Sequence, residues 1–151
     1  MADSSKEGNS TPALRLEEFP SRSYDKLRYG DTDRQGHINN AVFTTMLETG
    51  RVEVLLGGNG GLILPPGSAF VIVKLSMEFR AEIHWPGRVD IGTRVKAIGR
   101  SSATFEQAIF QDGRLAATAE TVIVQMNEGT RRSEPLAPEA VAHLQRFVAG
   151  A

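Results

Sequence analysis

Between residues 69 and 126, apolar and polar side chains alternate along the chain with a period of two. Alternation of this kind predicts strands that bury one face and expose the other. The longest run predicts a strand whose apolar face carries Val71, Val73, Leu75, Met77 and Phe79. Further strands, separated by turn residues such as Asp112-Gly113, are predicted at 89–98, 104–111 and 115–126. A shorter run predicts an earlier strand at 24–29.

One long stretch has a helical period instead. Apolar residues recur three and four positions apart between Val42 and Leu55. Asn39 or Asn40 is a suitable N-cap, and Gly57-Gly58 is a suitable end. Val141, Leu144 and Phe147 predict a second, short helix near the C-terminus.

The order of these elements predicts an α+β fold in a single domain, which suits a chain of 151 residues. A curved antiparallel sheet can cover the apolar stripe of one long helix. The expected boundaries are a flexible N-terminal tail at 1–20, the domain at 21–130, and a C-terminal tail with the short helix at 131–151. Because an open sheet edge is protected most simply by a second copy, we expect a dimer.

Composition narrows the function classes. Seventeen basic and eighteen acidic residues give a net charge of −1, which does not favour a nucleic-acid partner. The absence of cysteine excludes disulfides, thiolate metal sites and a cysteine nucleophile. His37, His84 and His143 are far apart in the sequence, so no zinc cluster is expected; His84 is expected to be structural and His143 exposed. No run suits a membrane span or a signal peptide, so the expected location is cytoplasmic, without membrane association.

The polar segment 30–40 precedes the long helix and carries the candidate chemistry. A helix N-terminus offers free N–H groups and a partial positive charge, which suit a carbonyl oxygen that becomes negative during attack. Asp33 could attack a thioester carbon or activate water, and His37 titrates near neutral pH. Asp, Gly and Asn are also common in loops without any catalytic role. The residues alone therefore leave a site and a structural loop equally open.

The same segment resembles a known family. It runs Tyr29-Gly30-Asp31-Thr32-Asp33, then Gly36-His37-Ile38-Asn39-Asn40-Ala41 and Phe43, with Glu48 and Arg51 following. This pattern is similar to that of the 4-hydroxybenzoyl-CoA thioesterase-like hotdog family, and the resemblance extends over roughly 21–126. It implies a hotdog fold, one long helix wrapped by a curved sheet, assembled as a homodimer or homotetramer. It also implies hydrolysis of acyl-CoA or acyl-carrier-protein thioesters, with no cofactor.

The resemblance implies roles for three residues. Asp33 matches the catalytic carboxylate, as nucleophile or general base. Asn40 falls where a backbone N–H polarises the thioester carbonyl. The segment is also similar to plant acyl-carrier-protein thioesterases, which have a histidine four residues after the aspartate, matched here by His37. The asparagine expected two residues after the aspartate is Gln35 in this chain.

Substrate-binding candidates lie outside this segment. Glu48 could line the acyl pocket or form an ion pair with Arg51. Arg100, Ser101 and Ser102 could bind coenzyme A phosphates or form a plain strand connection. Arg131 and Arg132 could bind phosphate too, or form a solvated charge pair. Asp31 is expected to cap its turn rather than assist Asp33.

Two other functions occur on the same fold. A non-catalytic acyl-CoA-binding or regulatory protein of the same fold is the main alternative, although Asp33 with His37 favours activity. A hydratase of the same fold carries Asp-x-Asn-Pro-x-His. His37 has the wrong spacing for that motif, and the chain has no Asn-Pro, so hydration is disfavoured.

Overall fold

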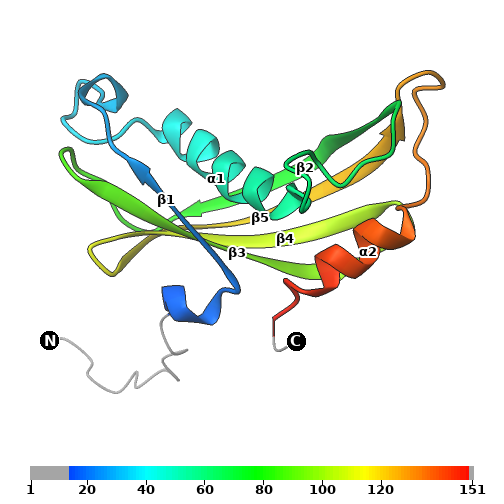
Figure 1. Ribbon diagram of the computed structural model, residues 1–151. Helices are drawn as coiled ribbons and strands as arrows, with labels where there is room; N and C mark the ends of the chain where they lie inside the picture. The colour runs from blue at the N-terminus through cyan, green and yellow to red at the C-terminus, as the bar shows by residue number, and fades with distance from the viewer. Residues whose placement is uncertain (1–13, 150–151) are drawn as a thin grey trace, which may run out of the picture.

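A five-stranded antiparallel sheet wraps around one long helix in the computed structural model, which describes residues 14–149 (Figure 1). The strand order is β1-β3-β4-β5-β2, so β1 and β2 are the edges. The strands are β1 (Ser21–Lys26), β2 (Ser68–Phe79), β3 (Arg88–Ile98), β4 (Ser102–Gln111) and β5 (Arg114–Asn127). These elements confirm the α+β fold and the curved sheet predicted from the sequence.

Helix α1 (Asn40–Leu55) lies on the concave face of the sheet (Figure 1). Its N-cap is Asn39, whose side chain accepts a hydrogen bond from Ala41 N at 3.1 Å. It ends at Leu55 because Leu56 is extended and Gly57 turns back to donate to the Gly61 carbonyl. The predicted cap and stop are therefore both present.

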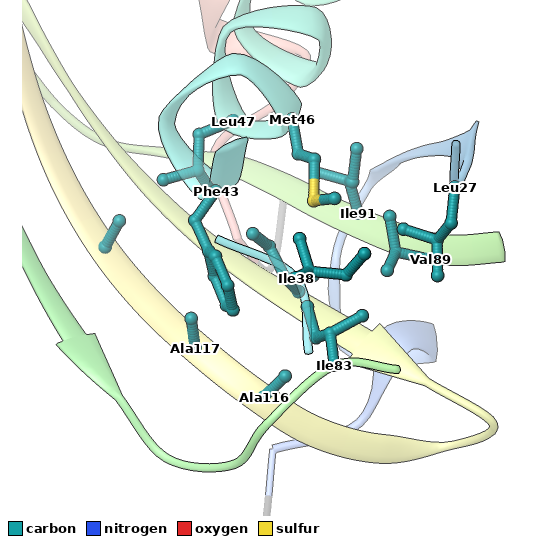
Figure 2. Packing of buried hydrophobic residues seen from close by; sticks show 12 residues of the cluster. Leu27, Ile38, Phe43, Met46, Leu47, Ile83, Val89, Ile91, Ala116 and Ala117 are labelled. Atoms are coloured by element: carbon teal, nitrogen blue, oxygen red, sulfur yellow. The ribbon is translucent and has the colours of Figure 1, made fainter. Parts of the chain in front are cut away.

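The buried face of α1 packs on the inner face of the sheet. Phe43, Met46 and Leu47 are each at most 2% exposed and point from the helix toward the strands (Figure 2). They meet side chains from β3, β5 and the segments flanking the helix, including Leu27, Ile38, Ile83, Val89, Ile91, Ala116 and Ala117. Small alanines on β5 leave room for the Phe43 ring. Burial of these apolar groups is the main driving force for this arrangement.

Gly50 is the point of closest approach between α1 and the sheet. A Cβ added there would lie 2.7 Å from Thr93 Oγ1, 2.8 Å from Gln107 Nε2 and 2.9 Å from Ile91 Cγ2. Real side chains do not tolerate such distances to closely packed neighbours. Glycine at this position therefore sets how closely the helix can lie on β3 and β4.

Strand β2 differs from its predicted alternation. A bulge between Ile72 and Lys74 shifts the register against β5, so Val73 has no direct partner. Val71 pairs with Val124, whereas Leu75 pairs with the buried Thr121, so Val71 and Leu75 point to opposite faces. The prediction that Val71 shares a face with Leu75, Met77 and Phe79 is therefore wrong. The alternation itself is present on the far side of the bulge.

The edge strand β2 also exposes apolar side chains. Ile72, Val73, Leu75 and Phe79 are between 39% and 59% exposed. An unpaired strand edge with apolar side chains is a common place for another chain to associate. The expected burial of one face of this strand is thus incomplete within a single chain.

The N-terminal boundary also differs from the expected one. Residues 1–13 of the predicted tail lie outside the described residues. A short 3-10 helix, η1 (Leu16–Glu18), precedes β1, and Phe19 is only 1% exposed. The Phe19 ring lies against Gly92, where a Cβ would be 2.5 Å from it. Residues 14–20 therefore already pack on the convex face of the sheet.

The predicted C-terminal helix is present as α2 (Pro138–Gln145). Leu144 is fully buried against the far end of α1 and the neighbouring strands. His143 was expected to be exposed, but its Nε2 lies 2.6 Å from the Val54 carbonyl oxygen. The expectation was wrong because α2 packs on the end of α1, and the sequence of α2 alone does not reveal that contact.

Within residues 14–149, no helix is long and apolar enough to cross a lipid bilayer.

We predict that Gly50→Ala lowers the free energy of unfolding by about 1–3 kcal/mol, because overpacking outweighs the higher helix propensity of alanine. Urea unfolding of the wild type and the variant measures this difference. Gly58→Ala is the control, since no atom lies within 4 Å of its added Cβ. Equal stability of Gly50→Ala and the wild type would contradict the close approach.

Candidate active site

The loop before α1 is fixed by a buried carboxylate. Asp31 is 6% exposed and accepts hydrogen bonds from Arg28 N at 3.0 Å and Arg28 Nη2 at 2.9 Å. Burial of the Asp31 carboxyl acts to raise its pKa, but the hydrogen bonds from Arg28 outweigh this and hold the pKa below its usual range. The Asp31 carbonyl also accepts from Asn39 N. Asp31 is thus placed as a structural residue, as expected.

A tight turn then presents Asp33 and His37. Asp33 N donates to the His37 carbonyl, and Gly36 N donates to the Asp33 carbonyl. Gly36 has a φ of +84°, a conformation that glycine adopts without strain. Gln35 N donates to Asp33 Oδ1 at 2.8 Å, which leaves Oδ2 free to face His37. The turn therefore fixes both predicted catalytic side chains on one side of the loop.

His37 lies between two carboxylates. Its Nδ1 is 3.7 Å from Asp33 Oδ2, and its Nε2 is 3.7 Å from Glu82 Oε1. Glu82 Oε2 is in turn 3.5 Å from His84 Nε2. The His37 side chain is 17% exposed and that of Asp33 is 26% exposed, so both are partly shielded from water. An imidazole in this position, between two carboxylates, is of the side-chain type that most often transfers protons in catalysis.

The start of α1 supplies the hydrogen-bond donor. Asn40 is the first helical residue, and its N–H has no acceptor within the helix. Ala41 N is already bonded to the Asn39 side chain. Asn40 N–H is therefore the helix-terminal donor available for an anion or a carbonyl oxygen.

A cavity of about 240 Å³ lies beside His37 and Asn40, and both residues line it. Its apolar lining comes from the loop, the helix and the end of β2, namely Ile38, Phe43, Phe79 and Ala81. Arg80 and Glu82 complete the lining. The Phe43 and Phe79 rings meet edge to face at 5.1 Å. Asp33 does not line this cavity and reaches it only through His37. The structure thus brings His37, Asn40 and Asp33 together, with His37 at the surface of the cavity.

The predicted substrate-binding residues lie elsewhere. Glu48 lines a second cavity, between the later turns of α1 and β2, and the alternative ion pair with Arg51 is not formed within the described residues. Arg100 and Ser101 lie in the β3–β4 turn, and Ser102 is the first residue of β4. That turn is separated from the site by the length of β3, about 30 Å at roughly 3.3 Å per residue. A single chain does not bring this turn to the candidate site.

Glu82 was missed by the sequence reasoning. It lies in the connection between β2 and β3, outside the motif, and reaches His37 because Ile38 N bonds to the Ile83 carbonyl. Gln111 holds the same connection in place, accepting from His84 N at 3.0 Å and donating to its carbonyl at 2.7 Å. The close spacing of Glu82 and His84 was the only local signal.

Comparison with known proteins identifies the family. The family model described as the thioesterase-like superfamily matches residues 27–144. The chain belongs to the thioesterase-like superfamily. Thioester hydrolysis is therefore the general reaction that its family and fold support.

Individual relatives agree with this assignment. The chain is 27% identical to a Thermus thermophilus thioesterase solved with coenzyme A and zinc, covering 87% of this chain and 96% of that one, with a TM-score of 0.75. A Pseudomonas aeruginosa protein shares the fold, with 24% identity, a TM-score of 0.81, and coverage of 91% of this chain and 97% of that one. A chloroplastic acyl-acyl carrier protein thioesterase of Arabidopsis thaliana is 32% identical over 57% of this chain. The match spans 47% of that plant protein.

We predict that Asp31→Asn lowers stability at neutral pH and that the loss depends on pH. The folded-state pKa of Asp31 is depressed, so its stabilising contribution is present above about pH 4, the ordinary pKa of an aspartate, and is lost as pH falls through the folded value. Urea unfolding should give a lower midpoint for the variant at pH 7 and a smaller difference at pH 3. Asp112→Asn, in the exposed β4–β5 turn, is the control. If the difference in urea midpoint between the wild type and Asp31→Asn is larger at pH 3 than at pH 7, the Asp31–Arg28 pair does not stabilise the fold as proposed.

Proposed function

We propose that this thioesterase-like chain cleaves an acyl-CoA or acyl-carrier-protein thioester with water. The observation that supports this most directly is the convergence of His37, backed by Asp33, and the Asn40 N–H on one cavity. A base and an oxyanion donor at one small cavity are the two elements that acyl transfer to water requires.

The chemistry then follows from these positions. His37 accepts a proton from water as the water oxygen bonds to the thioester carbon. The carbonyl oxygen becomes negative and accepts a hydrogen bond from Asn40 N–H at the positive end of α1. The C–S bond of the tetrahedral intermediate breaks, and the proton on His37 passes to the departing thiolate. The products are the free acid and the thiol.

Asp33 acts on this reaction through His37. Its Oδ2 faces the imidazole while its Oδ1 is held by Gln35 N, so the carboxylate stabilises the imidazolium that forms during attack. Because Asp33 does not line the cavity, a role as base partner fits the geometry better than direct nucleophilic attack. Glu82, on the other side of the ring, adds a second negative charge that stabilises the imidazolium.

A second copy of the chain is proposed to complete the site. A two-fold axis beside the exposed edge of β2 would pair the two β2 strands in antiparallel fashion. The Phe79 end of one copy, which lines the candidate cavity, would then lie beside the Ser68 end of its partner. The same symmetry would bring Arg100, Ser101 and Ser102 of one copy toward the site of the other, where they could bind coenzyme A phosphates.

We predict that Asp33→Asn lowers thiol release from acyl-CoA substrates by about 10²–10⁴-fold, the usual contribution of an acid–base group. His37→Asn should cause a loss of similar size, and the double variant should lose little more, because the two residues act as one unit. A thiol-reactive dye measures the release across short, long and aromatic acyl groups.

Asp112→Asn is the matched control and should keep full activity. Full activity of Asp33→Asn would show that the site is wrongly assigned, but the proposed hydrolase function would still stand. No thiol release by the wild type from any acyl-CoA or acyl-carrier-protein substrate would overturn the hydrolase, and favour the non-catalytic acyl-binding alternative.

The dimer has its own test. Val73→Lys places a charge on the exposed edge of β2 without touching either cavity wall, so we predict a shift from dimer to monomer in light scattering and a loss of thiol release. Lys74→Ala changes the next residue along the same strand and should leave both the oligomeric state and the rate of thiol release unchanged. A wild-type chain that is monomeric and fully active would contradict the shared site.

A further inference from the structure

The end of the sheet next to the candidate site carries three large aromatic side chains that are exposed. Tyr24 is 66% exposed, Tyr29 is 73% exposed and Trp85 is 44% exposed. Tyr29 and Trp85 meet edge to face, with ring centroids 5.3 Å apart. Neighbouring exposed apolar groups of this size commonly mark a surface that contacts another molecule. The core packing and the proposed reaction do not use these three rings.

Basic side chains lie among these rings. The Arg88 guanidinium carbon is 5.0 Å from the centroid of the Tyr24 ring, and Lys26 is the register partner of Arg88 on β1. Tyr24 and Lys26 share the convex face, because Asp25 between them pairs with Val89, which is buried against α1. We name this set the basic–aromatic strip, and its members are Tyr24, Lys26, Arg28, Tyr29, Trp85 and Arg88.

The basic–aromatic strip presents positive charge because its carboxylates lie behind its cations. Arg28 pairs with Asp31, but the Arg28 side chain is 79% exposed and that of Asp31 is 7% exposed. Arg88 pairs with Asp90 in the same manner, with side-chain exposures of 62% and 23%. Lys26 is exposed as well. The chain as a whole has a net charge of −1, so this positive surface is local. A molecule that approaches the strip meets the cations and the rings before the carboxylates.

The basic–aromatic strip begins beside the proposed reaction site. His84 directly precedes Trp85, and its ring centroid is 6.3 Å from that of His37. Tyr29 opens the turn that carries Asp31. Strand β1 is the edge of the sheet opposite β2. A dimer formed through β2 would therefore leave the strip open to a further molecule.

The composition of the strip fits a protein partner with an acidic surface. Tyr, Trp and Arg are the residue types most enriched at the positions that dominate binding energy in protein–protein interfaces. Exposed cations beside them favour a negatively charged partner, because complementary charges steer the encounter. The strip extends five residues along the chain from Tyr24 to Tyr29, or about 16 Å at roughly 3.3 Å per residue. That length suits a protein surface better than a single nucleotide.

We propose that the basic–aromatic strip docks the protein part of an acyl carrier protein, a small acidic protein that holds the acyl group on its own thiol arm. The arm then enters the cavity beside His37. This inference rests on the proposed hydrolase function, and it selects the carrier-protein thioester over the acyl-CoA thioester as the preferred substrate. Acidic groups of the carrier pair with Lys26, Arg28 and Arg88, and its apolar groups contact the exposed rings. Acyl-CoA has the same thioester but no protein surface for the strip.

The test compares two substrates with the same acyl group, one on coenzyme A and one on a bacterial acyl carrier protein. At low salt the wild type should have a kcat/KM about tenfold or more higher for the carrier-protein substrate. Lys26→Glu should lower this kcat/KM by about threefold, and Lys26→Glu/Arg88→Glu by about tenfold or more, through KM rather than kcat. Both variants should keep the kcat/KM for acyl-CoA within about twofold of the wild type.

The rings are tested separately from the charges. Tyr29→Ser removes an exposed ring without changing a charge, so it should lower kcat/KM for the carrier-protein substrate by about fivefold. Added salt should weaken the effect of Lys26→Glu/Arg88→Glu but should leave the effect of Tyr29→Ser in place, because salt screens charges and not apolar contact.

Arg146→Glu is the matched control, because it makes the same change of charge at an exposed position that follows α2. The chain beyond it joins Val95 through Val148, about 23 Å along β3 from Arg88 at roughly 3.3 Å per residue. Arg146→Glu should leave kcat/KM for both substrates unchanged. Circular dichroism and thermal unfolding identify any variant that misfolds. If Lys26→Glu/Arg88→Glu is folded and affects both substrates equally, or neither, the inference is overturned.

Docking is also measured without catalysis. Surface plasmon resonance with a carrier protein that bears its thiol arm but no acyl group should show binding to the wild type and to Arg146→Glu, and little binding to Lys26→Glu/Arg88→Glu. If no thioester is cleaved but this binding is present, the hydrolase proposal fails and the docking surface stands. If thioesters are cleaved with no preference for the carrier protein and no such binding, the docking surface fails and the hydrolase stands.

A membrane surface is the alternative occupant of the strip, since exposed aromatic and basic side chains also suit an anionic bilayer. Sedimentation with vesicles of anionic phospholipid measures this directly. Sedimentation of the wild type that is lost in Lys26→Glu/Arg88→Glu, together with no binding of the carrier protein, would overturn the inference in favour of a membrane.

Discussion

The close contact of helix α1 with the sheet at Gly50 is the constraint on which the rest of the structure depends. Because this residue has no side chain, the helix axis can lie against β3 and β4 and bury Phe43, Met46 and Leu47. The position of the helix then fixes its N-terminus beside the loop that carries His37. Burial provides most of the stability, and the resulting position of the helix end provides the electrostatics of the candidate site.

The loop in front of the helix is held in position by its own hydrogen bonds. Asp31 is held by Arg28 and bonds to Asn39 through its carbonyl, so the residues on both sides of the turn are fixed before any ligand arrives. The carboxylate with the depressed pKa is thus the structural one. Asp33 is more exposed and its Oδ2 faces the His37 ring. Two aspartates separated by one residue therefore have different surroundings, one buried against Arg28 and one facing a histidine.

Much of the fold could be predicted from the sequence because its periodicities are local and strong. The run from Val42 to Leu55 and the alternation in the later strands placed the elements correctly. The bulge at Val73 could not be predicted, because it depends on the register with β5. The contacts of Phe19 with Gly92 and of His143 with Val54 could not be predicted either, because each contact joins residues that are distant in the sequence. The motif located Asp33, His37 and Asn40, but Glu82 enters the site only through the pairing of Ile38 with Ile83.

Helix α1 spans the two cavities, and this has a consequence for how the protein can change. Asn40 at the first cavity and Arg51 at the second are eleven residues apart, close to three complete turns, or about 16 Å. Inserting or deleting one residue between them would rotate one end by about 100° relative to the other. The separation can therefore be altered only in steps of about a whole turn, through changes of three or four residues. The second cavity can more readily change shape through its side chains or the 57–67 connection than through the helix itself.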